Sequence, residues 1–323
     1  MKPKIAITMG DPAGIGPEII VKALNSPEVQ NAANYIICGN RKILENACTV
    51  AGISQSILNS NFVEIENCGS LEMDSYKIGE ISGKCGKASF DYIKKAIELA
   101  LTGKVQAVAT APINKESLKA GEIPFIGHTE IFGELTNTKD PLTLFEVNNL
   151  RIFFLTRHVS LKQACSMVTK ERICDYVKRC TKALHQLGIK SGTMAIAGLN
   201  PHSGEHGLFG QEETLAITPA VQELTKDGYN VVGPISADSV FHQALQGKFN
   251  SVLSLYHDQG HIAAKTYNFE KTISITCGMP ILRTSVDHGT AFDIAGKNLA
   301  SEISMIEAIL VAAKYAPNWI SNT

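Results

Sequence analysis

Short apolar runs alternate with amphipathic segments over almost the whole chain, and this alternation constrains the fold more than any other feature. Apolar runs typical of strands cover residues 5–9, 35–38, 105–110, 151–156, 194–198 and 252–256. Apolar residues at helical spacing predict helices over residues 17–24, 41–50, 90–101 and 170–187, and a last one from residue 302. Strands that alternate with helices in this way predict an α/β fold of mostly parallel sheets with helices on both faces. Residues 59–87 show the weakest periodicity and predict a surface excursion.

The overall charge indicates which kinds of partner the protein can bind, and the first residues indicate in which cellular compartment we expect it. Thirty Lys and Arg residues against thirty-one Asp and Glu residues give a net charge of −1. The overall charge therefore provides no electrostatic attraction to nucleic acid or to an anionic membrane. The first apolar run is too short for a secretory signal, and no run approaches the ~18 residues that a bilayer requires. We expect a cytoplasmic protein that binds neither nucleic acid nor membrane. The eight cysteines form no CxxC pair, and four lie among apolar neighbours (Cys38, Cys174, Cys180, Cys277), which predicts reduced core thiols.

Unusual polar residues follow the predicted strands, and ligands of parallel sheets gather at the carboxyl ends of strands. Residues 9–18, MGDPAGIGPE, place three glycines and a proline between a strand and a helix. The helix start could receive an anion, or the segment could be only a structural turn. It matches neither the dinucleotide fingerprint G-x-G-x-x-G nor the phosphate loop G-x-x-x-x-G-K-[ST].

Three histidines, His158, His202 and His257, each follow a predicted strand and could meet at one sheet edge. Three neutral imidazoles with an open position suit a catalytic divalent metal. From spacing alone, widely separated histidines are more often ordinary polar residues than metal ligands. Asp258 and Glu205 lie close in sequence and could orient such ligands.

Two further groups suit an anionic, oxygen-rich ligand. His128 and Thr129 follow Gly127, where Thr129 could instead cap a helix. Lys265 and Arg283 lie in apolar surroundings, where an unpaired cation is costly. A bound phosphate or carboxylate would offset that cost, and internal salt bridges are the alternative. The dense polar stretch over residues 287–297 is a candidate functional loop.

Taken together, these segments resemble known enzymes. Residues 10–18 and 288–297 are similar to segments of the isocitrate/isopropylmalate dehydrogenase superfamily. Residues 110–115, 127–130, 200–202, 256–260 and 283–285 narrow the resemblance to the 4-hydroxythreonine-4-phosphate dehydrogenase family of pyridoxal phosphate biosynthesis. The match runs in order over essentially the entire chain. It implies two α/β domains with a cleft between them, residues 1–125 plus 275–323 and residues 126–274. The second would carry the metal ligands and the contacts of a homodimer.

The resemblance also implies a chemistry: oxidation of 4-phosphohydroxy-L-threonine by NAD or NADP with a divalent metal (Zn, Mg, Mn or Co), then decarboxylation to 3-amino-2-oxopropyl phosphate. The cation would polarise the alcohol and later stabilise the enolate. By motif, the implied metal ligands are His158, His202 and His257, and the implied catalytic residues are Lys265 and Asp238. The implied substrate contacts are His128, Thr129, Lys265, Ser274 and Arg283. The implied cofactor contacts are His288, Gly289, Thr290, Ala291, Asp293 and Ile294.

Two departures from the family pattern bear on the substrate. Ser274 stands where the family typically has an Asn that contacts substrate. Residues 205–210 look more like a paralogous branch that oxidises 4-phospho-D-threonate or 4-phospho-D-erythronate and yields dihydroxyacetone phosphate. Two other classes of function are alternatives. A metal-dependent phosphatase or lyase would use the same histidines, but it leaves the loop at residues 288–297 unexplained. A non-catalytic phosphometabolite-binding protein could have lost the histidines and Lys265, and their presence counts against this class.

Overall fold

The computed structural model describes residues 2–69 and 71–319, which form two compact α/β units. The first unit comprises the chain up to Pro141 together with the chain from Ile273 onward, and the second spans Leu142–Thr272. The sequence-based division placed the break before residue 126. In the structure α6 (His128–Leu135) belongs to the first unit, because it packs against α4 (Gly83–Leu101) of that unit.

The sheet of the first unit has the strand order β3-β2-β1-β4-β11-β10. These strands are β1 (Lys4–Thr8), β2 (Asn34–Gly39), β3 (Val63–Asn67), β4 (Ala107–Thr110), β10 (Ile273–Cys277) and β11 (Leu282–Val286). All neighbouring pairs are parallel except β10 and β11, which are antiparallel. The carboxyl ends of β1, β2 and β4 therefore lie at one edge, where residues 9–18 begin.

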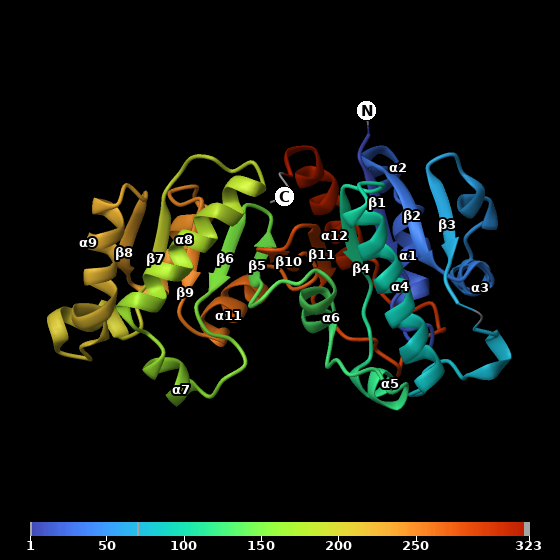
Figure 1. The fold of residues 1–323 in the computed structure, drawn as a ribbon, viewed down its shortest axis with the longest axis horizontal. Helices are drawn as coiled ribbons and strands as arrows, with labels where there is room; N and C mark the ends of the chain where they lie inside the picture. The colour runs from blue at the N-terminus through green and yellow to red at the C-terminus, as the bar shows by residue number, and fades with distance from the viewer. Residues whose placement is uncertain (1, 70, 320–323) are drawn as a thin grey trace. The chain divides into compact units, whose positions relative to one another are not determined.

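Helices cover the sheet of the first unit. They are α1 (Gly16–Leu24), α2 (Pro27–Ala32), α3 (Arg41–Ala51), α4, α5 (Lys115–Ala120), α6 and α12 (Ile303–Tyr315), with short 3₁₀ turns η1 (Gln55–Asn59), η2 (Met73–Ser75) and η5 (Ala316–Asn318). Figure 1 shows α4 running along β1 and β2, and α12 packs on β4 and β11. Local signals fix the ends of α3: the Asn40 side chain accepts from the N–H groups of Lys42 and Ile43, and Gly52 ends it at φ 67°.

The second unit has the strand order β5-β6-β9-β7-β8, in which only β5 and β6 are antiparallel. Its strands are β5 (Leu142–Val147), β6 (Leu150–Phe154), β7 (Met194–Ala197), β8 (Val231–Ile235) and β9 (Ser251–Ser254). Its helices are α7 (Leu161–Ser166), α8 (Lys170–Gln186), α9 (Thr218–Lys226), α10 (Ala237–Leu245) and α11 (His257–Tyr267), with the 3₁₀ segment η3 (Pro201–Gly207) and the π-helical turn η4 (Glu213–Ile217).

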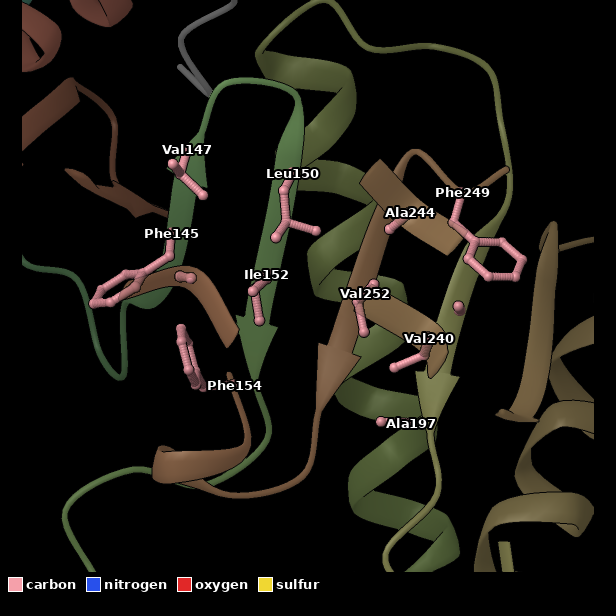
Figure 2. Close-up of a cluster of buried hydrophobic side chains, with 12 residues drawn as sticks. Phe145, Val147, Leu150, Ile152, Phe154, Ala197, Val240, Ala244, Phe249 and Val252 are labelled. Atoms are coloured by element: carbon pink, nitrogen blue, oxygen red, sulfur yellow. The ribbon is translucent and has the colours of Figure 1, made fainter. Parts of the chain in front are cut away.

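Buried apolar side chains join these strands to their helices. Figure 2 shows the cluster, in which Phe145, Ile152 and Val252 of neighbouring strands meet Val240 of α10. This core fixes the positions from which the loops after β6, β7 and β9 leave the sheet.

The predicted α/β fold with mostly parallel sheets is confirmed. The four cysteines expected in the core, Cys38, Cys174, Cys180 and Cys277, are buried. The surface excursion predicted over residues 59–87 is wrong in part. It contains β3, whose residues are all half-buried or exposed, which suits an edge strand and weakens its apolar signal. Within the described ranges, none of the helices has the length and apolar character needed to span a bilayer.

Candidate active site

Arg283 is the most unusual side chain of the first unit. It lies on β11, is only 3 % exposed, and donates from its two terminal nitrogens to the hydroxyls of Thr276 (2.8 Å) and Thr110 (3.0 Å). Its Cζ lies 4.9 Å from the ring centroid of Phe132, and its buried Nε has no hydrogen-bond partner. Across residues 2–69 and 71–319, no carboxylate forms an ion pair with it. Internal salt bridging is thus wrong for Arg283.

A buried cation that contacts two neutral hydroxyls and an aromatic ring, but no anion, is energetically unfavourable. Burial lowers the pKa of Arg283 from 12.5 to about 9, so the guanidinium is still charged at neutral pH. Taking such a charge out of water without an anionic partner costs several kcal/mol. A bound phosphate or carboxylate would supply the missing charge, and the planar guanidinium suits both groups. The side chain is therefore arranged as an anion receptor.

His128 lies beside this charge at the first position of α6. Its Nε2 atom is buried and has no hydrogen-bond partner, although the residue as a whole is half-buried. Burial and the charge of Arg283 hold the pKa of His128 well below 6.5, so the ring is neutral at neutral pH. A neutral imidazole can donate one hydrogen bond and accept another, which suits a hydroxylated anion. Arg283 and His128, both predicted substrate contacts, thus lie together.

Thr129 is the second residue of α6 and is half-buried. The alternative role of Thr129 as a helix cap is wrong, because Gly127 occupies the N-cap position and no side chain caps the helix. Instead, the Glu130 carboxylate accepts from the N–H of Ile126, which satisfies a backbone donor just before the helix. Ser274 lies opposite Ser285 in the β10–β11 pair and is half-buried.

In the second unit, His158 and His257 lie in one cavity. His158 follows β6 and His257 begins α11 after β9, and β6 and β9 are adjacent parallel strands. The two ring centroids are 6.0 Å apart. The cavity has a volume of about 320 Å³, and its lining includes Arg157, Tyr256 and Asp258.

The orientation of His257 is fixed from two sides. Its Nδ1 lies 2.6 Å from Oδ1 of Asp258, so Asp258 has the orienting position that the sequence suggested. On the next turn of α11, His261 stacks on His257 with the centroids 3.6 Å apart and the planes 12° apart. His261 is itself held by Phe145 and Phe154, at 4.4 Å and 4.6 Å, and its Nδ1 lies 2.8 Å from the carbonyl oxygen of His257. These contacts leave Nε2 of His257 to face a ligand.

His202 does not join this pair. It follows β7 in a left-handed turn, where φ is positive at five consecutive residues from His202 to His206. Glu213 holds the start of that loop, because its Oε1 accepts from the N–H groups of Leu199 (2.8 Å) and Asn200 (2.7 Å). Glu205, the suggested orienting carboxylate, lies in the left-handed turn, and Glu213 is the carboxylate that orders the loop.

The residues of this cavity partly fit a divalent metal. The rings of His158 and His257, with centroids 6.0 Å apart, are two imidazoles that would hold a divalent cation and would leave further positions for other ligands. Within the described part of the chain, however, no three His, Cys, Asp or Glu side chains are grouped closely enough to hold one. His158 and His257 fit two ligand positions, and the three-histidine site remains a prediction.

The glycine-rich turn over residues 9–18 packs against the predicted cofactor loop. Ile15 donates from its N–H to the carbonyl oxygen of Thr290 (3.0 Å), and a Cβ on Gly14 would lie 2.8 Å from the Thr290 side chain. Gly10 has φ 74°, and a Cβ there would lie 2.4 Å from the carbonyl oxygen of Pro112. The glycines are therefore explained by close backbone packing, which favours the structural-turn alternative.

Known proteins resemble this chain over almost its whole length. Residues 31–312 match the family described as "Pyridoxal phosphate biosynthetic protein PdxA". The chain is 59 % identical to a Fusobacterium nucleatum protein named "Putative D-threonate 4-phosphate dehydrogenase", over 99 % of both chains, and 56 % identical to a Clostridium botulinum protein of the same name, over 98 % of both. A crystal structure of 4-hydroxythreonine-4-phosphate dehydrogenase from Klebsiella pneumoniae superimposes with a TM-score of 0.88 at 36 % identity, covering 98 % of this chain and 100 % of that one.

The chain belongs to the PdxA family. Its members named above are dehydrogenases, so this PdxA chain is an oxidoreductase. The predicted family and enzyme class are confirmed.

The other predicted catalytic residues of this PdxA chain lie apart from the histidine cavity. Lys265 is two turns along α11 from His257, and its Nζ lies 5.2 Å from the ring centroid of Phe269. Asp238 is exposed in the first turn of α10. Neither side chain lines the cavity of His158 and His257, and both roles remain predictions.

Two residues of this PdxA chain have unusual surroundings that the sequence did not point out. His261 stacks under His257, and its spacing of four residues on a predicted helix could have revealed it. Asp11 is fully buried at the start of the glycine turn, where its Oδ1 accepts from the N–H of Ala13 (2.9 Å). Its Oδ2 has no partner among the described residues, and burial raises the pKa of this carboxyl from 3.8 to about 6.

Proposed function

We propose that this PdxA-family chain is an NAD(P)-dependent, divalent-metal-dependent 4-phospho-D-threonate dehydrogenase. The observation that carries the proposal is Arg283, a buried cation without an anionic partner beside the neutral ring of His128. A substrate with a phosphate at one end and a carboxylate at the other supplies such an anion. The names of the relatives at 59 % and 56 % identity support the D-threonate skeleton.

Arg283 would hold the phosphate or the carboxylate of the substrate. Its Nε is the unpartnered donor, and Thr110 and Thr276 keep the guanidinium plane fixed. His128 and Thr129 would contact oxygens of the same molecule, and the short hydroxyl of Ser274 would stand where the family typically has an Asn. Because the ring of His128 is neutral, it can donate to an anion or accept from a hydroxyl without adding charge.

In the second unit, His158 and His257 would hold the divalent metal, and His202 is the proposed third ligand. A bound metal would supply polarisation of the substrate alcohol, and a bound nicotinamide would accept the hydride that the alcohol loses. Asp258 and His261 keep the ring of His257 in place. Lys265 and Asp238 are proposed to move protons, and residues His288, Gly289, Thr290, Ala291, Asp293 and Ile294 to contact the adenosine side of NAD or NADP.

The reaction would oxidise the secondary alcohol to a ketone and then release carbon dioxide from the resulting β-keto acid, leaving dihydroxyacetone phosphate. 4-Phospho-D-erythronate would give the same product. The second candidate is the reaction expected first, on 4-phosphohydroxy-L-threonine in pyridoxal phosphate biosynthesis. The family description and the Klebsiella pneumoniae structure favour that candidate.

Parallel turnover assays distinguish these substrates. Purified, metal-loaded protein is incubated with NAD or NADP and each of the three phosphorylated acids, and reduced nicotinamide is measured by its absorbance. We expect the highest kcat/KM with 4-phospho-D-threonate. Turnover of 4-phosphohydroxy-L-threonine alone would assign the chain to the second candidate, and no turnover of any of the three would refute the substrate class.

A further inference from the structure

Three loops of the second unit carry the three histidines of the predicted metal site. They leave β6, β9 and β7, which are adjacent and parallel, so that the carboxyl ends of these strands lie at one edge of the sheet (Figure 1). His158 follows β6, His257 follows β9 and His202 follows β7. The sheet fixes only where each loop begins, so loops that supply ligands to one ion need further contacts to hold them in place.

Buried side chains join the first residues of these loops. The hydroxyl of Thr156, two residues after β6, donates to the carbonyl oxygen of Leu255 (2.8 Å), the residue after β9. The N–H of Leu255 donates to Oε1 of Gln259 (2.7 Å), and Nε2 of Gln259 donates to the carbonyl oxygen of Gly198 (2.8 Å), the residue after β7. A chain of three hydrogen bonds thus runs from the end of β6 through the end of β9 to the end of β7.

The two side chains of this chain of bonds are buried, with 3 % of Thr156 and 8 % of Gln259 exposed, so water does not replace these bonds when they are lost. The bond to Leu255 has an ordinary local role, because a glutamine in the first turn of a helix commonly accepts from an N–H just before it. The bond to Gly198 has no such role, since Gly198 belongs to another loop and is not part of α11. An ionised carboxylate could accept from Leu255, but it has no hydrogen to donate to Gly198.

We propose that Gln259 and Thr156 are positioning residues that hold the three histidine loops in register, so that the histidines can bind one divalent metal. The inference rests on the proposed function, which includes that metal. Gln259 joins the loop of His202 to that of His257, and Thr156 joins the loop of His158 to that of His257. Neither side chain would touch the metal, since both act on the backbone from which the histidines extend. Ligands held in place beforehand bind more tightly, because less of the chain has to be ordered on binding.

Zinc binding to the metal-free, full-length protein tests the proposal. Gln259→Met keeps the length of the side chain and removes both hydrogen bonds of the amide, and we expect the zinc affinity, measured by chelator competition, to fall about ten-fold. Thr156→Val keeps the shape of the side chain, removes its hydroxyl and should also weaken zinc binding. It keeps the test decisive if Gln259→Met folds poorly. Wild-type zinc affinity in both variants would overturn the proposal.

Ser254→Ala is the matched control, because it removes a similar bond within the sheet rather than between the loops. The hydroxyl of Ser254 is buried on β9 and donates to the carbonyl oxygen of Phe153 on β6 (2.9 Å), where the strand pairing already holds the backbone. Ser254→Ala and Thr156→Val should lower the free energy of unfolding to a similar extent, whereas only Thr156→Val should lower the zinc affinity. Equal losses of zinc affinity in these two variants would show that lower stability alone explains the effect, and would overturn the proposal.

Hydrogen exchange of the metal-free protein separates this inference from the proposed function. In Gln259→Met, residues 199–207 should exchange their amide hydrogens faster than in the wild type, because the loop after β7 loses its link to α11. Unchanged exchange in this segment would overturn the proposal. Wild-type protein that binds no zinc would instead refute the metal of the proposed function, and the exchange measurement would still decide whether Gln259 holds the loop.

Discussion

Replacing Arg283 with methionine should make the ligand-free protein more stable and less able to bind its substrate. Methionine has a similar length and no charge, so it can fill the space between β4, β10 and Phe132. The substitution removes a buried guanidinium that lies against the ring of Phe132 and whose hydrogen bonds go to the hydroxyls of Thr110 and Thr276. Because the buried charge of Arg283 lowers the stability of the ligand-free protein, we attribute its presence to substrate binding.

The size of the effect follows from the pKa and the two hydrogen bonds. The pKa of Arg283 falls from 12.5 to about 9 on burial. At 1.36 kcal/mol for each pKa unit, burying the charge costs about 5 kcal/mol. The two hydrogen bonds to neutral hydroxyls return about 3 kcal/mol. Arg283→Met should therefore raise the free energy of unfolding by about 2 kcal/mol and raise the Tm by a few degrees.

Urea unfolding and thermal melts, each with and without 4-phospho-D-threonate, measure both effects. At about 100 times its Kd the substrate should stabilise the wild type by about 2.7 kcal/mol, and it should stabilise the variant far less. Arg151→Met is the matched control, because Arg151 pairs with the buried carboxylate of Glu146 (3.3 Å) and its loss should destabilise the protein. A ligand-free Arg283→Met protein that is less stable than the wild type would refute the reasoning.

Three further predictions follow from single contacts. Because the pKa of Asp11 is raised, the folded protein binds a proton at this carboxyl more tightly than the unfolded chain, so the free energy of unfolding should fall by about 3 kcal/mol as the pH rises from about 4 to about 6. Asp11→Asn should remove this pH dependence in urea unfolding, and the same pH dependence in the variant would refute the role of Asp11. His261→Ala should weaken zinc binding about ten-fold in a chelator competition, with His261→Phe less affected because it keeps the stack on His257; equal affinities would exclude a positioning role. Glu213→Ala should lower the free energy of unfolding by about 1–3 kcal/mol, because the N–H groups of Leu199 and Asn200 lose their acceptor; an unchanged value would show that the loop does not depend on this carboxylate.

Periodicity predicted most of the fold. The helices expected over residues 41–50 and 170–187 occur at Arg41–Ala51 and Lys170–Gln186, because each has one buried apolar face and a capping side chain at its start. β3 was missed because an edge strand with half-buried and exposed glutamates lacks a continuous apolar run. The antiparallel pairs were not predicted either, since strand direction depends on connections that a local pattern does not contain.

The sequence indicated which residues of the site to inspect, but not their partners. The guanidinium of Arg283 donates hydrogen bonds to Thr110 and Thr276, which lie on two other strands, so its partners could not be predicted from the sequence around it. The pairing of His158 with His257 follows from the adjacency of β6 and β9, which the predicted strand ends suggested. The left-handed turn at His202 had no visible signal, because its positive φ values fall mostly on residues other than glycine.

Product analysis tests the central claim most directly. Purified, metal-loaded protein is given 4-phospho-D-threonate and NAD or NADP, and reduced nicotinamide, carbon dioxide and dihydroxyacetone phosphate are measured in the same reaction. We predict equal amounts of all three, with the yield lost in Arg283→Met. Release of inorganic phosphate without reduced nicotinamide, or no conversion by a protein that binds the substrate, would contradict the assignment as a dehydrogenase of this acid.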